Sequence, residues 1–312
     1  MINQDYLYTD QWNDVSNVTL LMDSLYLYAT DKESRSNYCA PKLQTKNKTT
    51  CFIQVSLHSE DMLEIVGKGE WVSLNSTDSV REFLHSQKIT NVYLDVTGMS
   101  CRIVAPFLLV GIEMKLNVFV VYTEPSSYKI AEFKKVGINK DLSEAVEGVY
   151  PLPGLGKVIP HRSEPLFVTL LGFEGGRLAF LLSDQTPSSD KIRPIFGVPG
   201  YRVNYPFVSY LGNRKSLHDT RCWQYAEYAE ANSIVDAYIT LVKLLKDNKR
   251  DDLEMIVAPI GTKPHAIGAI LFAIKYRDKV ELLYDNPRRN VHRTDGVGKV
   301  LSCNVSRLIE DY

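Results

Sequence analysis

Residues 255–287 read Met-Ile-Val-Ala-Pro-Ile-Gly-Thr-Lys-Pro-His-Ala-Ile-Gly-Ala-Ile-Leu-Phe-Ala-Ile-Lys-Tyr-Arg-Asp-Lys-Val-Glu-Leu-Leu-Tyr-Asp-Asn-Pro. The apolar start of this stretch breaks at Gly261–Pro264 and resumes with apolar residues at helical spacing, which predicts a strand, a tight loop and a helix. Residues 280–284 are then the next strand, parallel to the first. A chain built from such units is an α/β protein with a mostly parallel sheet.

The loop around Lys263 brings together groups that attract an anion. Gly261 lets the chain turn sharply off the strand, and Pro264 suits the first helical turn. Backbone N–H groups, the positive end of the helix dipole and the Lys263 ammonium then share one small volume at the carboxyl edge of the sheet. We therefore expect a bound phosphate or other anion; in the alternative reading, Thr262 is an ordinary helix cap and Lys263 is solvated.

A similar pattern occurs earlier in the chain. Val92-Tyr-Leu-Asp-Val-Thr-Gly-Met-Ser is followed by an apolar run over 103–114 and by Val118-Phe-Val-Val-Tyr-Thr-Glu-Pro. Tyr122 follows Gly98 at nearly the distance at which Tyr284 follows Gly261. Both glycines are therefore expected to precede equivalent helices after parallel strands, through either an internal pseudo-repeat or a chance likeness of two ordinary α/β units.

A third strand–turn–helix–strand unit is predicted over 166–198, and 216–249 should be the longest helical region, in one piece or two. The fold expected is a mostly parallel, doubly wound Rossmann-like sheet, or two fused pseudo-repeat units if the duplication is real. Residues 1–150 would form the first Rossmann-like unit with N-terminal strands. Residues 151–312 would form the second, with the long linking helix and a C-terminal basic loop.

The composition limits the classes to which the protein can belong. The formal net charge of -1 provides no general field for capturing duplex nucleic acid, so any anion site must be local. The five cysteines show no Cys-x-x-Cys spacing, which favours a reducing compartment. The polar N-terminus does not resemble a secretory signal, and no apolar run approaches the roughly 18 residues of a membrane span. We expect a cytoplasmic protein with no membrane partner.

The candidate ligand-binding residues are glycines, hydroxyls and cations of the predicted loops: Thr97, Gly98, Ser100, Arg102, Arg177, Gly261, Thr262, Lys263, His265, Arg288, Arg289, His292 and Arg293. The last four belong to a basic loop over 286–298, expected as a flap near the Lys263 loop, with a solvated loop or a partner-binding surface as alternatives. The glycines before Arg177 allow close approach either of a ligand or of a neighbouring element.

Catalytic candidates are Asp95 and Asp285, which end strands, and His265, which follows the anion loop. An aspartate at a strand end more often caps the next turn, and a histidine in a first helical turn more often completes a capping network. The histidines form no ligand-spaced pair, so no metal is predicted. Neither loop is a Walker A motif and no Gly-x-Gly-x-x-Gly follows a strand, so no cofactor is predicted beyond a nucleotide or other phosphate-bearing ligand.

The loop Ile260-Gly-Thr-Lys-Pro-His-Ala-Ile-Gly-Ala resembles the Gly-Gly-Thr-Lys-x-Met-x-x-Ala type of loop in the Rossmann-like CARF sensor domains of prokaryotic antiviral systems. The related SAVED domains consist of two such units fused, which fits the similarity between 95–125 and 255–287. The match rests on Gly261, Thr262 and Lys263, and the first loop has Met99-Ser100 where the resemblance predicts a lysine.

The resemblance implies that Thr97, Ser100, Thr262 and Lys263 bind a cyclic or linear oligonucleotide signal. No nuclease-type effector domain follows either half, so the effector activity would belong to a protein partner. The chain would then be a nucleotide-binding sensor or partner subunit of antiviral defence. The alternatives are an enzyme acting on a nucleotide or phosphoester, and a structural or interaction subunit.

Overall fold

The computed structural model describes residues 4–128, 143–146, 148–156, 164–247, 253–289 and 293–312. The chain divides into two compact units. The first consists of Met1–Lys129, Leu152–Leu155 and Val291–Tyr312, and the second of Ile130–Pro151 and Gly156–Asn290. The expected division at residue 150 is therefore wrong for the C-terminal segment, which returns to the first unit because its strand completes the first sheet.

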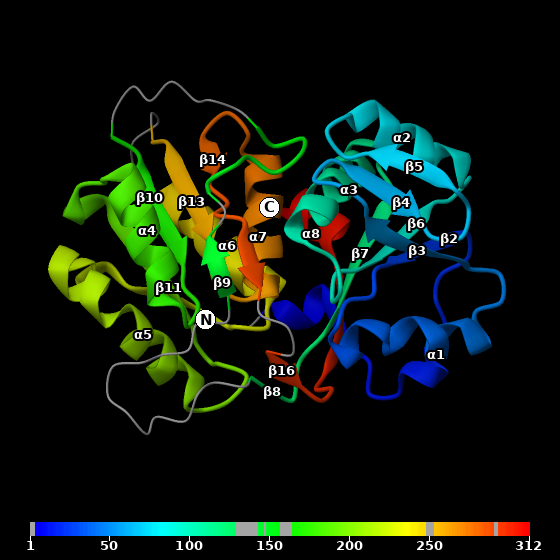
Figure 1. Cartoon of the computed structure of the whole chain (residues 1–312), viewed down its shortest axis with the longest axis horizontal. Coiled ribbons are helices and arrows are strands. Elements are labelled where there is room, and N and C mark those ends of the chain that lie inside the picture. Colours follow the sequence, from blue (N-terminus) through cyan, green and yellow to red (C-terminus); the bar gives the residue numbers. More distant parts are fainter. Residues whose placement is uncertain (1–3, 129–142, 147, 157–163, 248–252, 290–292) are drawn as a thin grey trace. The chain divides into compact units, whose positions relative to one another are not determined.

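The first unit is built on an eight-stranded mixed sheet with the order β1-β17-β7-β6-β2-β3-β4-β5 (Figure 1). Its strands are β1 (Thr9–Gln11), β2 (Ser24–Tyr28), β3 (Cys51–Leu57), β4 (Met62–Ile65), β5 (Glu70–Ser73), β6 (Asn91–Asp95), β7 (Asn117–Thr123) and β17 (Val300–Asn304). The four central strands, β3, β2, β6 and β7, are mutually parallel. The outer strands β4, β5, β17 and β1 are antiparallel to their neighbours.

The α-helices described in this unit are α1 (Cys39–Lys46), α2 (Thr77–Ser86), α3 (Cys101–Glu113) and α8 (Val305–Asp311). Ser76 caps α2 by accepting a hydrogen bond from the Ser79 N–H. A small antiparallel pair joins β8 (Ser127–Tyr128) to β16 (Thr294–Asp295). Every residue of β6 is buried, as expected for a strand covered on both faces.

The second unit has a five-stranded sheet in which every pair of neighbours is parallel. In chain order its elements are β10 (Leu166–Leu170), α4 (Gly175–Gln185), β11 (Ile192–Gly197), α5 (Tyr205–Thr220), β12 (Glu227–Ala229), α6 (Ile234–Asp247), β13 (Met255–Pro259), α7 (Lys263–Lys275) and β14 (Val280–Leu282). The strand order is β12-β11-β10-β13-β14. The chain thus moves outward from β10 to β12 and then returns to place β13 on the other side of β10.

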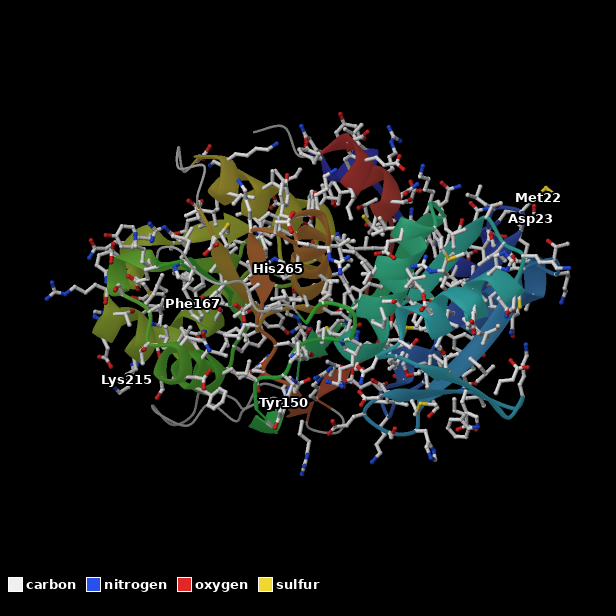
Figure 2. All side chains as sticks on the ribbon, turned by 90° about the horizontal axis from the view of Figure 1, so that it is seen from above. Met22, Asp23, Tyr150, Phe167, Lys215 and His265 are labelled. Carbon is white, nitrogen blue, oxygen red and sulfur yellow. The ribbon has the colours of Figure 1, made fainter. Side chains whose placement is uncertain are left out.

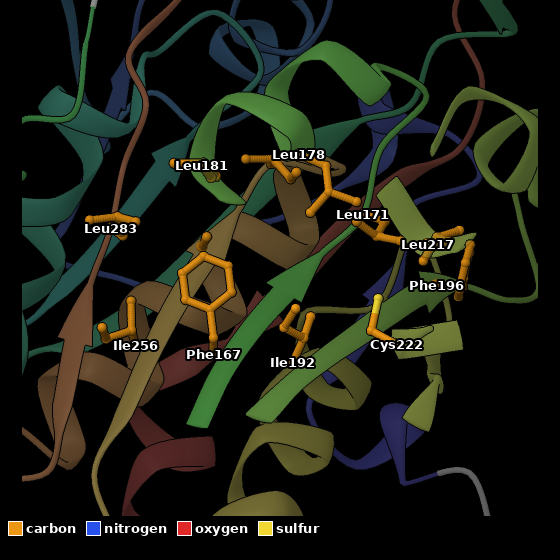
Figure 3. Packing of buried hydrophobic residues seen from close by; sticks show 12 residues of the cluster. Phe167, Leu171, Leu178, Leu181, Ile192, Phe196, Leu217, Cys222, Ile256 and Leu283 are labelled. Carbon is orange, nitrogen blue, oxygen red and sulfur yellow. The ribbon is translucent and has the colours of Figure 1, made fainter. Parts of the chain in front are cut away.

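Apolar residues cover both faces of this sheet. On one face Phe167 of β10 packs in a cluster with Leu178 of α4 and Leu217 of α5, and α4 lies across the strands (Figure 3). Helices α6 and α7 pack closely against each other, since a Cβ on Gly268 would lie 2.9 Å from the Ala237 Cβ. Outside the sheet, β9 (Ser143–Val146) pairs antiparallel with β15 (Pro287–Arg289).

The strand–loop–helix–strand units predicted over 92–125 and 255–287 are confirmed. Strands β6 and β7 are parallel, as are β13 and β14, and a helix connects each pair. The helices begin at Cys101 and Lys263, shortly after Gly98 and Gly261. The helical region predicted over 216–249 is in two pieces, so a single long linking helix is wrong: α5 ends at Thr220, where Arg221 adopts a left-handed conformation, and β12 separates α5 from α6. Within the described ranges, no helix has the length and apolar character needed to cross a bilayer.

Candidate functional site

Two loops touch at the carboxyl edge of the second sheet. A Cβ on Gly261, which follows β13, would lie 2.7 Å from the carbonyl oxygen of Leu171, which follows β10. A Cβ on Gly172 would likewise lie 2.7 Å from the Ile260 carbonyl oxygen. Side chains at either position would force the backbones apart, so both residues must be glycine. The contact occurs between β10 and β13, where the strand order reverses.

Thr262 caps α7 and connects its start to the loop after β12. Its hydroxyl accepts a hydrogen bond from the His265 N–H at 3.3 Å and donates one to the Ala231 carbonyl oxygen at 2.6 Å. Lys263, the first helical residue, is partly exposed. The N-terminus of α7 therefore presents a positive helix dipole and a lysine at this edge, while the Thr262 hydroxyl is engaged within the fold.

His265 lies under this loop and is 0% exposed. Its Nε2 is 3.0 Å from the Glu230 carbonyl oxygen, so Nε2 carries the proton and donates. Among the described residues, Nδ1 has no hydrogen-bond partner. Burial lowers the pKa of His265 below its ordinary value, because a charged imidazole would lose its hydration there. The ring is therefore neutral at pH 7 and buried in the scaffold.

Arg177 and Asp285, two candidates from distant parts of the chain, are brought together. Arg177 in α4 donates from Nε and Nη2 to the two carboxylate oxygens of Asp285, each at 2.6 Å. Its Nη1 donates to the Ile260 carbonyl oxygen at 2.8 Å. Burial opposes the charge on Arg177, but the hydrogen bonds that it donates to Asp285, together with the negative charges of Asp285 and Glu174, outweigh burial and raise the arginine's pKa. The ion pair therefore holds the Ile260 backbone against α4 and against the residues that follow β14.

In the first unit the candidates at the end of β6 also have internal partners. Asp95, 1% exposed, accepts hydrogen bonds from the Tyr26 hydroxyl at 2.8 Å and from the Thr97 N–H at 3.1 Å. Thr97 accepts one from the Thr123 N–H at 3.0 Å, which ties the loop to the end of β7. Such contacts are those of a strand-end aspartate and threonine that hold a turn.

The other residues of this loop differ in exposure. A Cβ on Gly98 would lie 2.0 Å from the Ala29 carbonyl oxygen, so the loop passes directly over the end of β2. Ser100 is exposed at the N-terminus of α3 and makes no capping hydrogen bond with its side chain. Arg102 donates to the Asp61 carboxylate at 2.8 Å and to the Glu60 carbonyl oxygen at 3.2 Å.

The basic loop divides between the two units. Arg288 is exposed in β15 of the second unit, whereas Arg293 belongs to the first unit and its Nε donates to Glu33 at 3.1 Å. The side chain of Arg289 and the whole of His292 lie outside the described residues. The flap predicted near Lys263 stays a prediction.

A buried polar cluster around Arg35 was not among the sequence candidates. Arg35 is 3% exposed, donates to Glu33 at 2.9 Å and to the Thr123 carbonyl oxygen at 2.7 Å, and shares Glu33 with Arg293. The polar composition of residues 31–50 predicts a mobile or phosphate-steering loop, whereas residues 39–46 form α1. No local pattern marks an arginine whose partners are so distant in the chain.

The catalytic candidates are buried within the two units. Asp95, His265 and Asp285, the three catalytic candidates, are all at most 1% exposed. Among the residues that the structure describes, no group of three His, Cys, Asp or Glu side chains is placed to hold a metal ion. Comparison with known proteins finds no family model and no curated protein that matches this chain.

Proposed function

We propose that the protein binds a nucleotide or oligonucleotide signal at the carboxyl edge of the second sheet, as a sensor or as the partner subunit of an effector. The observation that carries this proposal is the reversal of strand order between β10 and β13, with the N-terminus of α7 at that point. Open parallel sheets bind ligands outside the carboxyl ends of their strands, where the order reverses.

The strand order supports a doubly wound, Rossmann-like interpretation of this unit. Numbered along the chain from β10, the strands follow 3-2-1-4-5, the order of the dinucleotide-binding sheets. The glycine contact between the loops after β10 and β13 keeps the backbone free of side chains there. The parallel βαβ unit at Gly98 is compatible with the two-unit organisation of SAVED domains, and we include that duplication in the proposal.

The groups that would hold the ligand are the positive end of the α7 dipole and the Lys263 ammonium, which suit a phosphate. Pro264 has no N–H, and the His265 N–H is bonded to the Thr262 hydroxyl. The Arg177–Asp285 pair and the Thr262 cap would act behind them by keeping the loop in position before the ligand arrives. Burial of all three catalytic candidates favours binding over turnover. On the resemblance to CARF domains, the proposal includes a role in prokaryotic antiviral defence in the cytoplasm, with the effector activity on a protein partner.

A ligand screen followed by lysine variants tests the proposal. Thermal shifts against mononucleotides and linear and cyclic oligonucleotides should reveal a ligand that adds about 2.7 kcal/mol of stability at 100 times its Kd. Lys263→Ala should then weaken binding by about 1.5–3 kcal/mol and leave the unliganded protein's stability nearly unchanged. Lys263→Arg should restore part of the binding.

The matched control is Lys275→Ala, in the last turn of the same helix, which should bind like the wild type. Unchanged affinity in Lys263→Ala, or the absence of any ligand, would contradict the proposed site. Product formation from the bound ligand would favour the enzyme alternative over the sensor.

A further inference from the structure

The second unit carries a concentration of exposed apolar side chains. Of the 17 large apolar residues exposed in the described part of the chain, eight lie between Val198 and Tyr228. Five of them are aromatic and come from α5, the following 3-10 turn Cys222–Tyr225 and the edge strand β12: Phe207, Tyr210, Trp223, Tyr225 and Tyr228. Exposed apolar groups on this scale mark an interaction surface. We call it the α5–β12 surface.

Two rings of this surface lie against the same buried ring. Phe196 of β11 is buried, and the exposed rings of Tyr210 and Tyr228 have centroids 6.4 and 6.3 Å from its ring. One buried ring thus supports aromatic side chains from α5 and from β12. Since β12 is the edge strand, Tyr228 lies at the edge of the sheet.

Positive charge accompanies these rings. Residues 192–228 contain five lysines and arginines, Arg193, Arg202, Arg214, Lys215 and Arg221, and two acidic residues, Asp219 and Glu227, in a chain whose net charge is -1. The Arg193 guanidinium lies 4.4 Å from the centre of the Tyr225 ring. Arg214 is exposed one helical turn beyond the exposed aromatic Tyr210, and Lys215 extends from the surface of α5 (Figure 2).

We propose that the α5–β12 surface binds single-stranded nucleic acid. Unpaired bases stack on exposed aromatic rings, while lysines and arginines neutralise the backbone phosphates, and both kinds of group alternate here. A duplex keeps its base faces stacked and could not use the rings. Aromatic residues and arginines are also common in protein interfaces, so the excess of positive over negative residues is what favours a polyanion as the ligand of this surface. This surface is independent of the loop at Lys263 and does not rest on the function proposed for it.

The test is fluorescence anisotropy of the full chain with labelled 12-nucleotide dT and U oligomers. Saturable binding is expected at low salt, and its log affinity should fall with log salt with a slope of about -0.7 for each phosphate contacted. Tyr228→Ala and Trp223→Ala should each weaken binding by about tenfold, since each removes one stacking platform. Tyr228→Phe, which keeps the ring, should bind like the wild type.

Two further variants separate charge from stacking. Arg214→Glu with Lys215→Glu should weaken binding and flatten its salt dependence. Trp71→Ala is the control, because Trp71 is 46% exposed in the first unit and lies outside the surface. Thermal melts of every variant check that these exposed changes leave the fold intact.

Several outcomes would overturn the proposal. They are no binding at low salt, equal affinity in the Tyr228→Ala and Trp223→Ala proteins, or a duplex bound as tightly as the single strand. If these variants instead break up an oligomer of the chain and leave nucleic-acid binding unchanged, the surface is an interface between copies.

Discussion

Arg177 and Asp285 form a bidentate ion pair in which the side chains are 4% and 0% exposed. We predict that Arg177→Met will lower the free energy of unfolding by about 3–5 kcal/mol, because it leaves the Asp285 carboxylate buried without its partner. Arg177→Met combined with Asp285→Leu should recover much of that loss. Urea unfolding measures both effects.

Arg81→Met is the control, since Arg81 pairs with Glu113 at the surface and such pairs contribute about 0–1 kcal/mol. Equal losses of unfolding free energy in Arg81→Met and Arg177→Met would mean that breaking the buried Arg177–Asp285 pair costs no more than breaking a surface pair. That result would remove its proposed role in positioning the Ile260–Thr262 segment.

His265 makes stability depend on pH. Its pKa in the folded protein lies below the value of about 6.5 of the unfolded chain, because the ring is buried. Neither state holds the extra proton at pH 8, but as the pH falls below about 6.5 the unfolded chain takes it up first, so stability falls, by up to about 1.4 kcal/mol per pH unit. Unfolding free energies measured between pH 8 and pH 5 should decline more steeply in the wild type than in His265→Gln.

The readout for His265 is this slope and not the absolute stability, which the substitution also changes. His218→Gln, an exposed position in the last turn of α5, should keep the wild-type slope. Parallel pH profiles for wild type and His265→Gln would contradict a buried neutral imidazole.

At the scale of elements, α4 and α5 approach each other through backbone. A Cβ on Gly175 would lie 1.9 Å from the Gly212 carbonyl oxygen, so Gly175→Ala must push the two helices apart. We expect a loss of at least about 1–3 kcal/mol in urea unfolding, although alanine is the better helix former.

Gly111→Ala in α3 provides the comparison, because its Cβ would meet only the end of the Val118 side chain, at 2.9 Å. That side chain can move, so the cost should be smaller. A Gly175→Ala protein as stable as Gly111→Ala would show that the contact between α4 and α5 tolerates a methyl group.

The C-terminal segment completes the sheet of the first unit. Strand β17 lies between β1 and β7, and Val300, Cys303 and Leu308 are buried. Deleting residues 291–312 should leave the edge of β7 unpaired and expose these contacts. Hydrogen exchange followed by mass spectrometry should then show lost protection in β6 and β7 peptides, with β10 and β13 peptides of the other unit as the internal reference. Unchanged protection of β7 would mean that the first sheet is stable without this strand.

Local pattern was enough to predict the two βαβ units around Gly98 and Gly261. Their strands are short buried runs, and the helix at Lys263 begins with a threonine cap and an early proline, features that depend on near neighbours in the chain. The same reasoning predicted a helical region over 216–249, in one piece or two. It missed β12, whose three residues form a strand only because β11 supplies its hydrogen bonds.

For the candidate site, the sequence identified single residues, but the structure was needed to show their partners. The sequence named Arg177 and Asp285 separately, as a ligand group and a catalytic carboxylate, yet they are partners across 108 residues of chain. The pairing of Arg293 with Glu33 and the insertion of β17 beside β7 also join distant segments. Periodicity and caps report interactions within a few residues and so determine the elements. Which buried charges meet, and which sheet a returning strand completes, depends on contacts that form only when the chain folds.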